Sequence, residues 1–218
     1  MRPVWIVGYP RTGSRLLTSY LNSTGSFNPL IDEWLGPKYV TENLLPPYSV
    51  VHSHHFISKF SFGDKPLIEK SLPGIRYIWL RRRDLVATAV STFIARQTSI
   101  YWAKSKQDVE QHSNLPVRFG NGLFTAYQEV RARDEFWKFY LTEDDEYITT
   151  YYEDIAEDLL RICDFLGIDT VTSEECEYHK LQHPMTEELC RLLQDAVDSK
   201  KVEYSWPKSH FEQPIPLL

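Results

Sequence analysis

The chain has 218 residues, of which 42% are hydrophobic and 25% are charged, a composition that is usual for a globular protein. Its length fits a single domain over residues 1–218 and is sufficient to bury a core. The formal net charge of −6 disfavours a non-specific nucleic-acid binder, because such proteins are usually basic, so an anionic ligand has to be held by local positive charge.

The first predicted element is a buried strand that runs directly into a loop. Apolar residues 5–7 lead into Gly8, and apolar side chains recur at helical spacing from Ser14 onward, which predicts a helix there. The loop between strand and helix contains Arg11 and a second glycine, Gly13. Backbone N–H groups in such a loop, the dipole of the helix and the charge of Arg11 together favour an anion.

The spacing of the two glycines, Gly8-x-x-x-x-Gly13, is that of a nucleotide P-loop, but the residues that follow differ. A loop for nucleoside triphosphates continues with Lys and then with a Ser or Thr that holds magnesium. Here the pair is Ser14-Arg15, so we predict a phosphate-like ligand without a dedicated magnesium ligand. The alternative is a strand-turn-helix corner in which the glycines serve geometry alone.

Candidate catalytic acids and histidines come next in the chain. Asp32 and Glu33 stand among bulky apolar residues, where partial desolvation would raise the pKa of an acid and suit it to act as a general base. A short strand predicted over residues 49–52 runs into His54, and the carboxyl ends of strands in α/β sheets are where ligands bind. The histidine spacing is not that of a zinc site. Helix capping by the acids and structural roles for the histidines are the alternatives.

A basic segment follows the next clear strand, which is predicted over residues 76–80. Arg81, Arg82 and Arg83 come directly after it, and Asp84 is a suitable N-cap for the helix that follows. Arginines between a strand end and a helix start predict a second anion site, in the same topological position as the first. The alternative is a solvated basic edge, which the acidic balance of the whole chain disfavours.

The rest of the chain continues to alternate helices and strands. The polar stretch 98–122 is interpreted as an irregular segment that could serve as a lid facing the substrate. The later elements are a helix over 123–141, a strand over 146–151, a helix from Ile155 that Gly167 stops, a helix over 187–198 and an irregular tail over 206–218. This alternation predicts an α/β fold, a central and mainly parallel sheet flanked by helices in three layers.

Three of these segments together resemble a sulfotransferase that uses PAPS (3′-phosphoadenosine 5′-phosphosulfate) as its donor. Residues 9–14, Tyr-Pro-Arg-Thr-Gly-Ser, are similar to the family's loop for the 5′-phosphosulfate end. Arg83 and Ser91, eight residues later, match the pair that holds the 3′-phosphate. Residues 150–155, followed by Phe-Leu-Gly at 165–167, are similar to the family's Tyr-Glu-Asp-Leu element and its helix.

The segment from Arg81 to Thr98 is most similar to the bacterial, Stf0-like branch, which trehalose sulfotransferase typifies. The resemblance implies a P-loop-like fold over a single sulfotransferase domain, transfer of a sulfuryl group from PAPS to a hydroxyl of a carbohydrate or glycolipid, PAP as product and no metal. Arg15 stands where the family usually has a second Ser or Thr, so it either replaces that contact with a charge or points away. The residues that the resemblance assigns to the donor are Arg11, Thr12, Gly13, Ser14, Arg15, Arg83 and Ser91.

The resemblance also implies catalytic roles. Arg11 is expected to stabilise the charge that grows on the leaving 5′-phosphate. Carbohydrate and bacterial members use a Glu about one helix beyond the loop, which matches Glu33, whereas cytosolic members use the His of a Lys-Thr-His strand end, which matches His54. The Stf0-like segment favours Glu33. Two other functions stay open: a kinase-like nucleotide binder that uses ATP and Mg²⁺, and a family member that binds PAPS without turnover.

The expected location is cytoplasmic. The three cysteines include no C-x-x-C pair, which favours a reducing compartment. The N-terminus does not show the pattern of a signal peptide, and no apolar run approaches the roughly 18 residues that span a bilayer.

Overall fold

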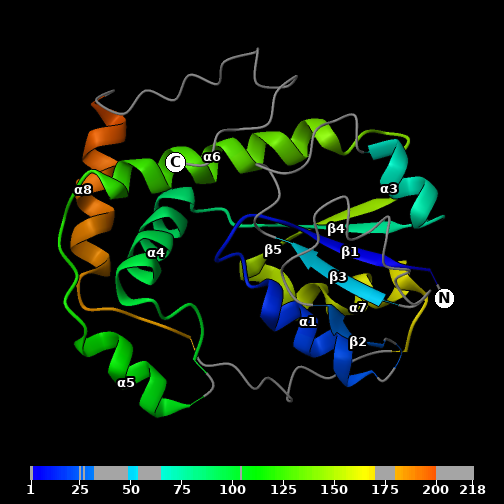
Figure 1. The fold of residues 1–218 in the computed structure, drawn as a ribbon, viewed down its shortest axis with the longest axis horizontal. Coiled ribbons are helices and arrows are strands. Elements are labelled where there is room, and N and C mark those ends of the chain that lie inside the picture. Colours follow the sequence, from blue (N-terminus) through cyan, green and yellow to red (C-terminus); the bar gives the residue numbers. More distant parts are fainter. Residues whose placement is uncertain are drawn as a thin grey trace. The chain divides into compact units, whose positions relative to one another are not determined.

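The structure is a computed structural model that describes residues 2–24, 26, 28–31, 49–53, 65–103, 105–169 and 180–199. Its strands are β1 (Val4–Gly8), β2 (Asn28–Ile31), β3 (Ser49–Ser53), β4 (Arg76–Arg81) and β5 (Tyr147–Tyr151). Its helices are α1 (Ser14–Ser23), α3 (Lys65–Ser71), α4 (Leu85–Thr98), α5 (Lys106–Asn114), α6 (Gly122–Tyr140), α7 (Ile155–Leu166) and α8 (Thr186–Asp198), and the 3₁₀ turn η3 (Tyr152–Asp154) precedes α7 (Figure 1).

The strands form one five-stranded sheet in the order β2-β3-β1-β4-β5, and every neighbouring pair is parallel. In this register Ile6 of β1 lies between His52 of β3 and Ile78 of β4, and Gly8 pairs with Leu80. Because all strands run in one direction, their carboxyl ends meet at one edge, which is where α/β sheets bind ligands. The predicted parallel sheet is confirmed.

By its internal contacts the chain divides into two compact units. The first comprises residues 1–81, 133–176 and 206–218 and contains the sheet, and the second comprises 82–132 and 177–205. The single domain expected from the chain length stays a prediction.

Helices cover both faces of the sheet in the first unit, as Figure 1 shows. All five residues of β1 are buried, as a strand covered on both sides requires. One face packs against α3 and the end of α6 through the cluster Trp5, Val7, Ile68, Leu72, Ile75, Tyr77, Trp79, Phe136, Trp137, Tyr140 and Leu141. The other packs against α1 and α7 through the cluster Val4, Ile6, Leu17, Tyr20, Leu21, Ile78, Leu80, Ile148, Ile155, Leu159, Ile162, Cys163 and Leu166. The three predicted layers are therefore present.

The second unit is helical, and α4 packs against α8 within it. Helix α4 begins where the sequence predicts, because the Asp84 side chain accepts a hydrogen bond from the Ala87 N–H at 2.7 Å. Its buried residues include Ala89, Val90 and Phe93, whose spacing places them on one face of the helix.

Two described elements depart from the sequence interpretation. Residues 98–122 are not wholly irregular, because α5 lies within them and begins with a capping box between Ser105 and Asp108. Strand β2 was not predicted because it is short and contains Pro29, a residue that parallel sheets accept in edge strands such as this one. The irregular tail predicted over 206–218 lies outside the described residues.

In the described ranges no helix combines the length and the apolar composition that crossing a bilayer requires.

Candidate active site

The loop that follows β1 starts at a tightly packed strand end. A Cβ on Gly8 would lie 2.4 Å from the carbonyl oxygen of Leu80 on the neighbouring strand, so any larger residue would push β1 and β4 apart. The indole N–H of Trp137, on α6, donates a hydrogen bond of 2.8 Å to the carbonyl oxygen of Gly8. The chain therefore leaves the sheet at a fixed point.

The loop itself holds two residues in the left-handed region. Arg11 has a φ of 70° and Gly13 a φ of 85°. For a residue with a Cβ this region costs about 1–2 kcal/mol and is often kept for a functional reason. The hydroxyl of Thr12 donates to the carbonyl oxygen of Tyr9 at 2.9 Å, and both residues are buried. Arg11 is half-buried. The backbone thus turns at the residue that the resemblance assigns to the 5′-phosphosulfate end of PAPS.

Helix α1 begins directly after this loop, so the positive end of its dipole lies at the loop. Its N-cap is Gly13, which has no side chain to cap the first amide groups. Its first turn contains no acid and carries the half-buried Arg15, although a helix dipole disfavours a cation there. The buried hydroxyl of Thr12 is committed to Tyr9, and Ser14 is also buried. Backbone amides and the two arginines are thus the groups suited to an anion.

The third segment of the resemblance contacts the first. A Cβ on Gly13 would meet the ring of Tyr152, the first residue of η3, and the Ile155 side chain lies just beyond. The Tyr-Glu-Asp element therefore forms one wall of the loop in the first unit.

The three arginines at the end of β4, residues 81–83, do not share one role. Arg81 makes a bidentate ion pair with Asp134 of α6, with Nε–Oδ1 at 2.9 Å and Nη2–Oδ2 at 2.6 Å. Its guanidinium also lies over the Trp79 ring, 4.3 Å from the centroid. Burial lowers the pKa of Arg81, but the hydrogen bonds and the charge of Asp134 outweigh it and raise the pKa. Arg81 therefore anchors the strand end, and its charge is paired with an internal acid.

Arg83 and Ser91 lie in the second unit, on either side of the start of α4. Arg83 is exposed and lines an open cavity of about 460 Å³ with residues of α4, Tyr127 of α6 and two residues of α8. Ser91 is half-buried and lies about 140° around the helix axis from Val86, which also lines this cavity. Joint binding of one phosphate by Arg83 and Ser91 stays a prediction.

Glu33 and His54, the two candidate bases, lie outside the described residues. Each follows a strand of the sheet: β2 ends at Ile31, two positions before Glu33, and β3 ends at Ser53. Because these strands are parallel to β1, both candidates come after carboxyl ends at the edge where the loop begins.

Two residues of α6 that sequence reasoning did not single out contact the strand ends of the site, namely Asp134 and Trp137. No local motif marks them, because their partners are 53 and 129 positions away in the sequence.

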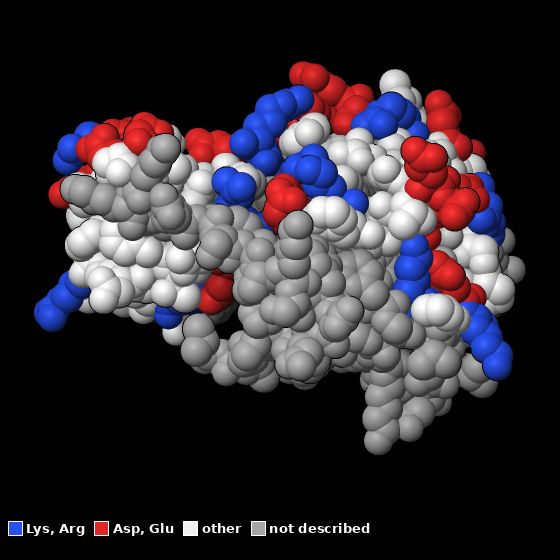
Figure 2. All heavy atoms as spheres, turned by 90° about the horizontal axis from the view of Figure 1, so that it is seen from above, with Lys and Arg blue, Asp and Glu red and all other residues white. Residues whose placement is uncertain are grey.

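The described residues carry mixed charge on the face in Figure 2 and hold no metal cluster. On the described part of the face in Figure 2, Lys and Arg are interspersed with Asp and Glu, unlike the one-sign surface of a non-specific nucleic-acid binder. No group of three His, Cys, Asp or Glu able to hold a metal occurs among the described residues.

Comparison with known proteins places the chain in a family. The model of the Stf0 sulphotransferase family matches residues 54–192, more than half of the chain. The chain belongs to the Stf0 sulphotransferase family. This confirms the resemblance given by the sequence and, with it, a transferase of the sulfotransferase type.

Solved structures of two sulfotransferase domains are similar to this Stf0 sulphotransferase family member. A sulfotransferase domain from the curacin biosynthetic pathway has a TM-score of 0.50 at 14% identity, covering 95% of this chain and 94% of that one. A sulfotransferase domain from the Synechococcus PCC 7002 olefin synthase has a TM-score of 0.46 at 15% identity, covering 94% and 96%. A search of curated proteins finds no match. The P-loop-like α/β fold expected from the resemblance is confirmed.

The part of the chain matched by the Stf0 family begins after the loop at 9–13. It includes Arg83, Ser91 and both α6 residues that hold the strand ends. The loop of this sulphotransferase family member is therefore joined to the matched part through the contacts of Gly8 with Trp137 and of Gly13 with Tyr152.

Proposed function

We propose that this family member transfers a sulfuryl group from PAPS to a hydroxyl group of a carbohydrate or glycolipid. The observation that carries the proposal is the loop after β1, where a left-handed Arg11 and a glycine N-cap precede a helix start without acids. Backbone amides at such a turn favour a phosphate-like group. Ser14-Arg15 replaces the Lys and magnesium-holding hydroxyl of a triphosphate loop, which favours a phosphosulfate over ATP.

Sulfuryl transfer requires little covalent chemistry from the protein, and catalysis consists mainly of positioning and charge stabilisation. The acceptor oxygen attacks the sulfur, the bond from sulfur to the bridging oxygen breaks, and its electron pair stays on the 5′-phosphate of PAP. Arg11 and the amides of Thr12 and Gly13 hold the charge that grows there. Glu33 takes the proton of the acceptor hydroxyl, with His54 as the second candidate for that role.

The other end of the donor is assigned to Arg83 and Ser91. They follow β4, the neighbour of β1 in the sheet, and the chain leaves β4 at Arg81, next to the strand end that starts the loop. A guanidinium and a hydroxyl are suited to a 3′-phosphate, and recognition of that group distinguishes PAPS from ATP.

Thermal unfolding with and without ligands tests the proposal. We expect 3′,5′-adenosine bisphosphate to raise the Tm and ATP with Mg²⁺ to leave it unchanged, because a ligand at 100 times its Kd stabilises by about 2.7 kcal/mol. Transfer of radiolabelled sulfate from PAPS to a panel of sugars and glycolipids then tests the reaction. Stabilisation by ATP alone would favour a kinase-like binder, and binding of the bisphosphate without transfer to any acceptor would favour a non-catalytic protein.

A further inference from the structure

We infer that two residues of α6, Asp134 and Trp137, form a clamp that positions the two segments assigned to the phosphates of the donor. We call it the α6 clamp. The assignment of the two segments rests on the proposed function, whereas the clamp rests on contacts within the first unit alone.

The first arm of the α6 clamp is the hydrogen bond from Trp137 to Gly8. Both groups are buried, and the distance of 2.8 Å is that of a well-formed bond. The peptide bonds of the described chain are trans, so the C=O of Gly8 and the N–H of Tyr9 point in opposite directions. Fixing the Gly8 carbonyl toward α6 therefore directs the first amide of the loop away from α6.

The second arm is the ion pair of Asp134 with Arg81. Its two parallel hydrogen bonds fix the guanidinium in position and direction, and the Trp79 ring supports one face of it. Arg81 is the last residue of β4, so this arm fixes where the chain continues toward Arg83.

The two arms act on neighbouring strand ends. Gly8 pairs with Leu80, so Gly8 and Arg81 end adjacent strands of the sheet. Asp134 and Trp137 are three positions apart, which places both on one face of α6. One turn of α6 thus contacts both Gly8 and Arg81, the strand ends from which the two segments start, and fixes the distance between them.

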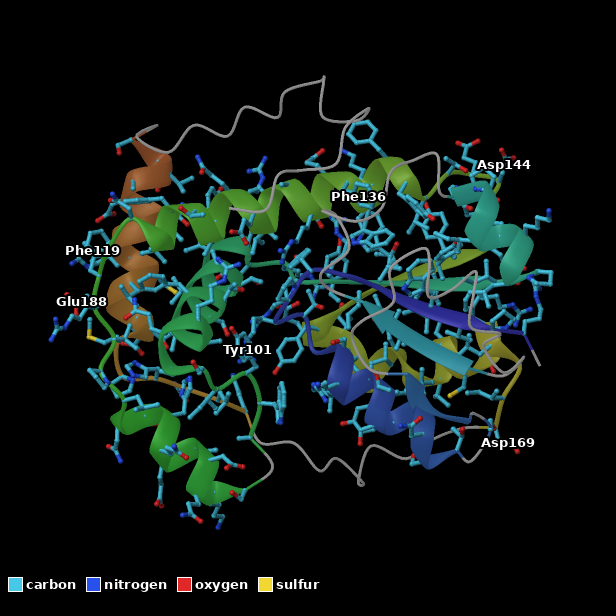
Figure 3. All side chains as sticks on the ribbon, in the orientation of Figure 1. Tyr101, Phe119, Phe136, Asp144, Asp169 and Glu188 are labelled. Carbon is cyan, nitrogen blue, oxygen red and sulfur yellow. The ribbon has the colours of Figure 1, made fainter. Side chains whose placement is uncertain are left out.

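Aromatic rings pack around Trp137 in the first unit. The Trp137 ring makes edge contacts with Trp5, Phe136 and Tyr140 at centroid distances of 6.2, 5.0 and 5.2 Å. Figure 3 labels Phe136, whose side chain lies on the side of α6 that faces the sheet. Phe136 shares this packing but has no polar side-chain group. A substitution of Phe136 therefore changes the packing and leaves both hydrogen-bonded arms in place.

Three variants test the α6 clamp. Trp137→Phe removes the indole N–H, Asp134→Asn removes the negative charge that pairs with Arg81, and Phe136→Leu is the packing control. Loss of one buried hydrogen bond predicts about tenfold weaker binding of 3′,5′-adenosine bisphosphate by Trp137→Phe. The same variant should also bind adenosine 5′-phosphosulfate more weakly, because the loop is assigned to the 5′ end that both ligands carry. Asp134→Asn should instead weaken binding only of 3′,5′-adenosine bisphosphate, which carries the 3′-phosphate. Phe136→Leu should lower the Tm without changing either affinity.

Hydrogen exchange provides a readout that needs no ligand. Trp137→Phe should speed amide exchange in residues 9–13, and Phe136→Leu should not. If the wild-type protein binds no bisphosphate, the proposed function fails, while exchange in the loop still decides the first arm of the clamp. Unchanged exchange and unchanged affinity in Trp137→Phe would overturn the inference, as would equal effects of Phe136→Leu. If Trp137→Phe does not fold, 3-benzothienylalanine at position 137 keeps the ring shape and removes only the N–H.

Discussion

The Tyr152 ring occupies the space that a side chain on Gly13 would need. A Cβ on Gly13 would lie 2.4 Å from Cδ2 of Tyr152 and 2.9 Å from its Cε2. Gly13 also has a φ of 85°, so both the space and the backbone conformation favour glycine. The start of α1, where we place the phosphosulfate, is thus shaped by the Tyr-Glu-Asp element that forms η3.

Gly13→Ala should therefore damage donor binding as well as stability. The methyl group has to displace Tyr152 or the loop, so we expect a lower Tm and at least about tenfold weaker binding of 3′,5′-adenosine bisphosphate. The matched control is Gly167→Ala at the end of α7, where φ is 68° and an added Cβ would meet no atom within 4 Å. That variant should lower the Tm and keep the affinity. Equal affinities of the two variants would contradict the role given to Tyr152.

Arg11→Ala should lose most of the turnover. Removal of one preorganised donor from a developing oxyanion costs about 10²–10³ in rate. Since Arg11 is expected to act mainly on the transition state, kcat should fall more than the affinity for the bisphosphate product. Sulfate transfer and calorimetry measured on the same preparation check this. Turnover at the wild-type level would remove Arg11 from the mechanism.

The stability of the sheet should depend on pH through Glu146, at the edge opposite to the loop. Burial acts to raise the pKa of Glu146, but hydrogen bonds from Arg2 and Arg76 outweigh it and hold the pKa below its usual value. The unfolded chain therefore binds the proton more readily. The stabilisation is complete above the pKa of about 4.3 in the unfolded chain and is lost as the pH falls through the lower pKa of the folded state.

Glu146→Gln should consequently lower the Tm at pH 7 and lose that deficit as the pH is lowered below about 4. The side chain is 41% exposed, so 1 M salt should reduce the deficit at pH 7 as well. Glu143→Gln, in the same loop before β5, is the control. A deficit that is independent of pH would show that the substitution acts through packing.

Sequence patterns predicted the elements whose signals are local. Asp84 as the N-cap of α4 and Gly167 as the end of α7 are both confirmed, because a cap depends on residues within one turn. Helix α5 carried a local signal too, the Ser105-x-x-Asp108 capping box, but its weak apolar pattern led to the interpretation of an irregular segment. Strand β2 has only four residues, one of them a proline, so the alternation of apolar and polar residues that indicates a strand cannot be recognised in it.

The candidate site divides in the same way. The loop from Gly8 to Ser14 could be predicted because strand, glycines and helix follow one another directly. The role of Arg81 could not, because an arginine run has the same sequence whether it binds an anion or an internal acid. Asp134 and Trp137 became recognisable only when the fold brought α6 to the strand ends.

The choice of general base can be decided by pH–rate profiles. Glu33→Gln should abolish most of the transfer and remove the acid limb of kcat against pH, because an amide cannot take the acceptor proton. His54→Ala should keep that limb. Full activity of Glu33→Gln together with an inactive His54→Ala would reverse the ranking. Bisphosphate affinity, which neither change should alter, shows whether each variant is folded.

Recognition of the 3′-phosphate is assigned to Arg83 and Ser91, and two ligands isolate it. Arg83→Ala should weaken binding of 3′,5′-adenosine bisphosphate about 10- to 100-fold, because a charge-assisted hydrogen bond is lost, and should leave binding of adenosine 5′-phosphosulfate unchanged. Ser91→Ala should act in the same direction with a smaller effect, since it removes a neutral donor. Calorimetric titration of both ligands into each variant gives the ratio of affinities.

The control for these variants is Arg191→Ala, on α8 in the same unit, whose exposed pair with Asp195 contributes little. It matches the loss of charge but should change neither affinity. Arg83 also lines the open cavity beside Tyr127, on a different side of α4 from Ser91. If Arg83→Ala changes the ratio of the two affinities and Ser91→Ala does not, the phosphate binds on the cavity side and Ser91 is not part of its site. If neither variant changes the ratio, the protein does not read the 3′-phosphate at α4, and the assignment of PAPS through this pair is wrong.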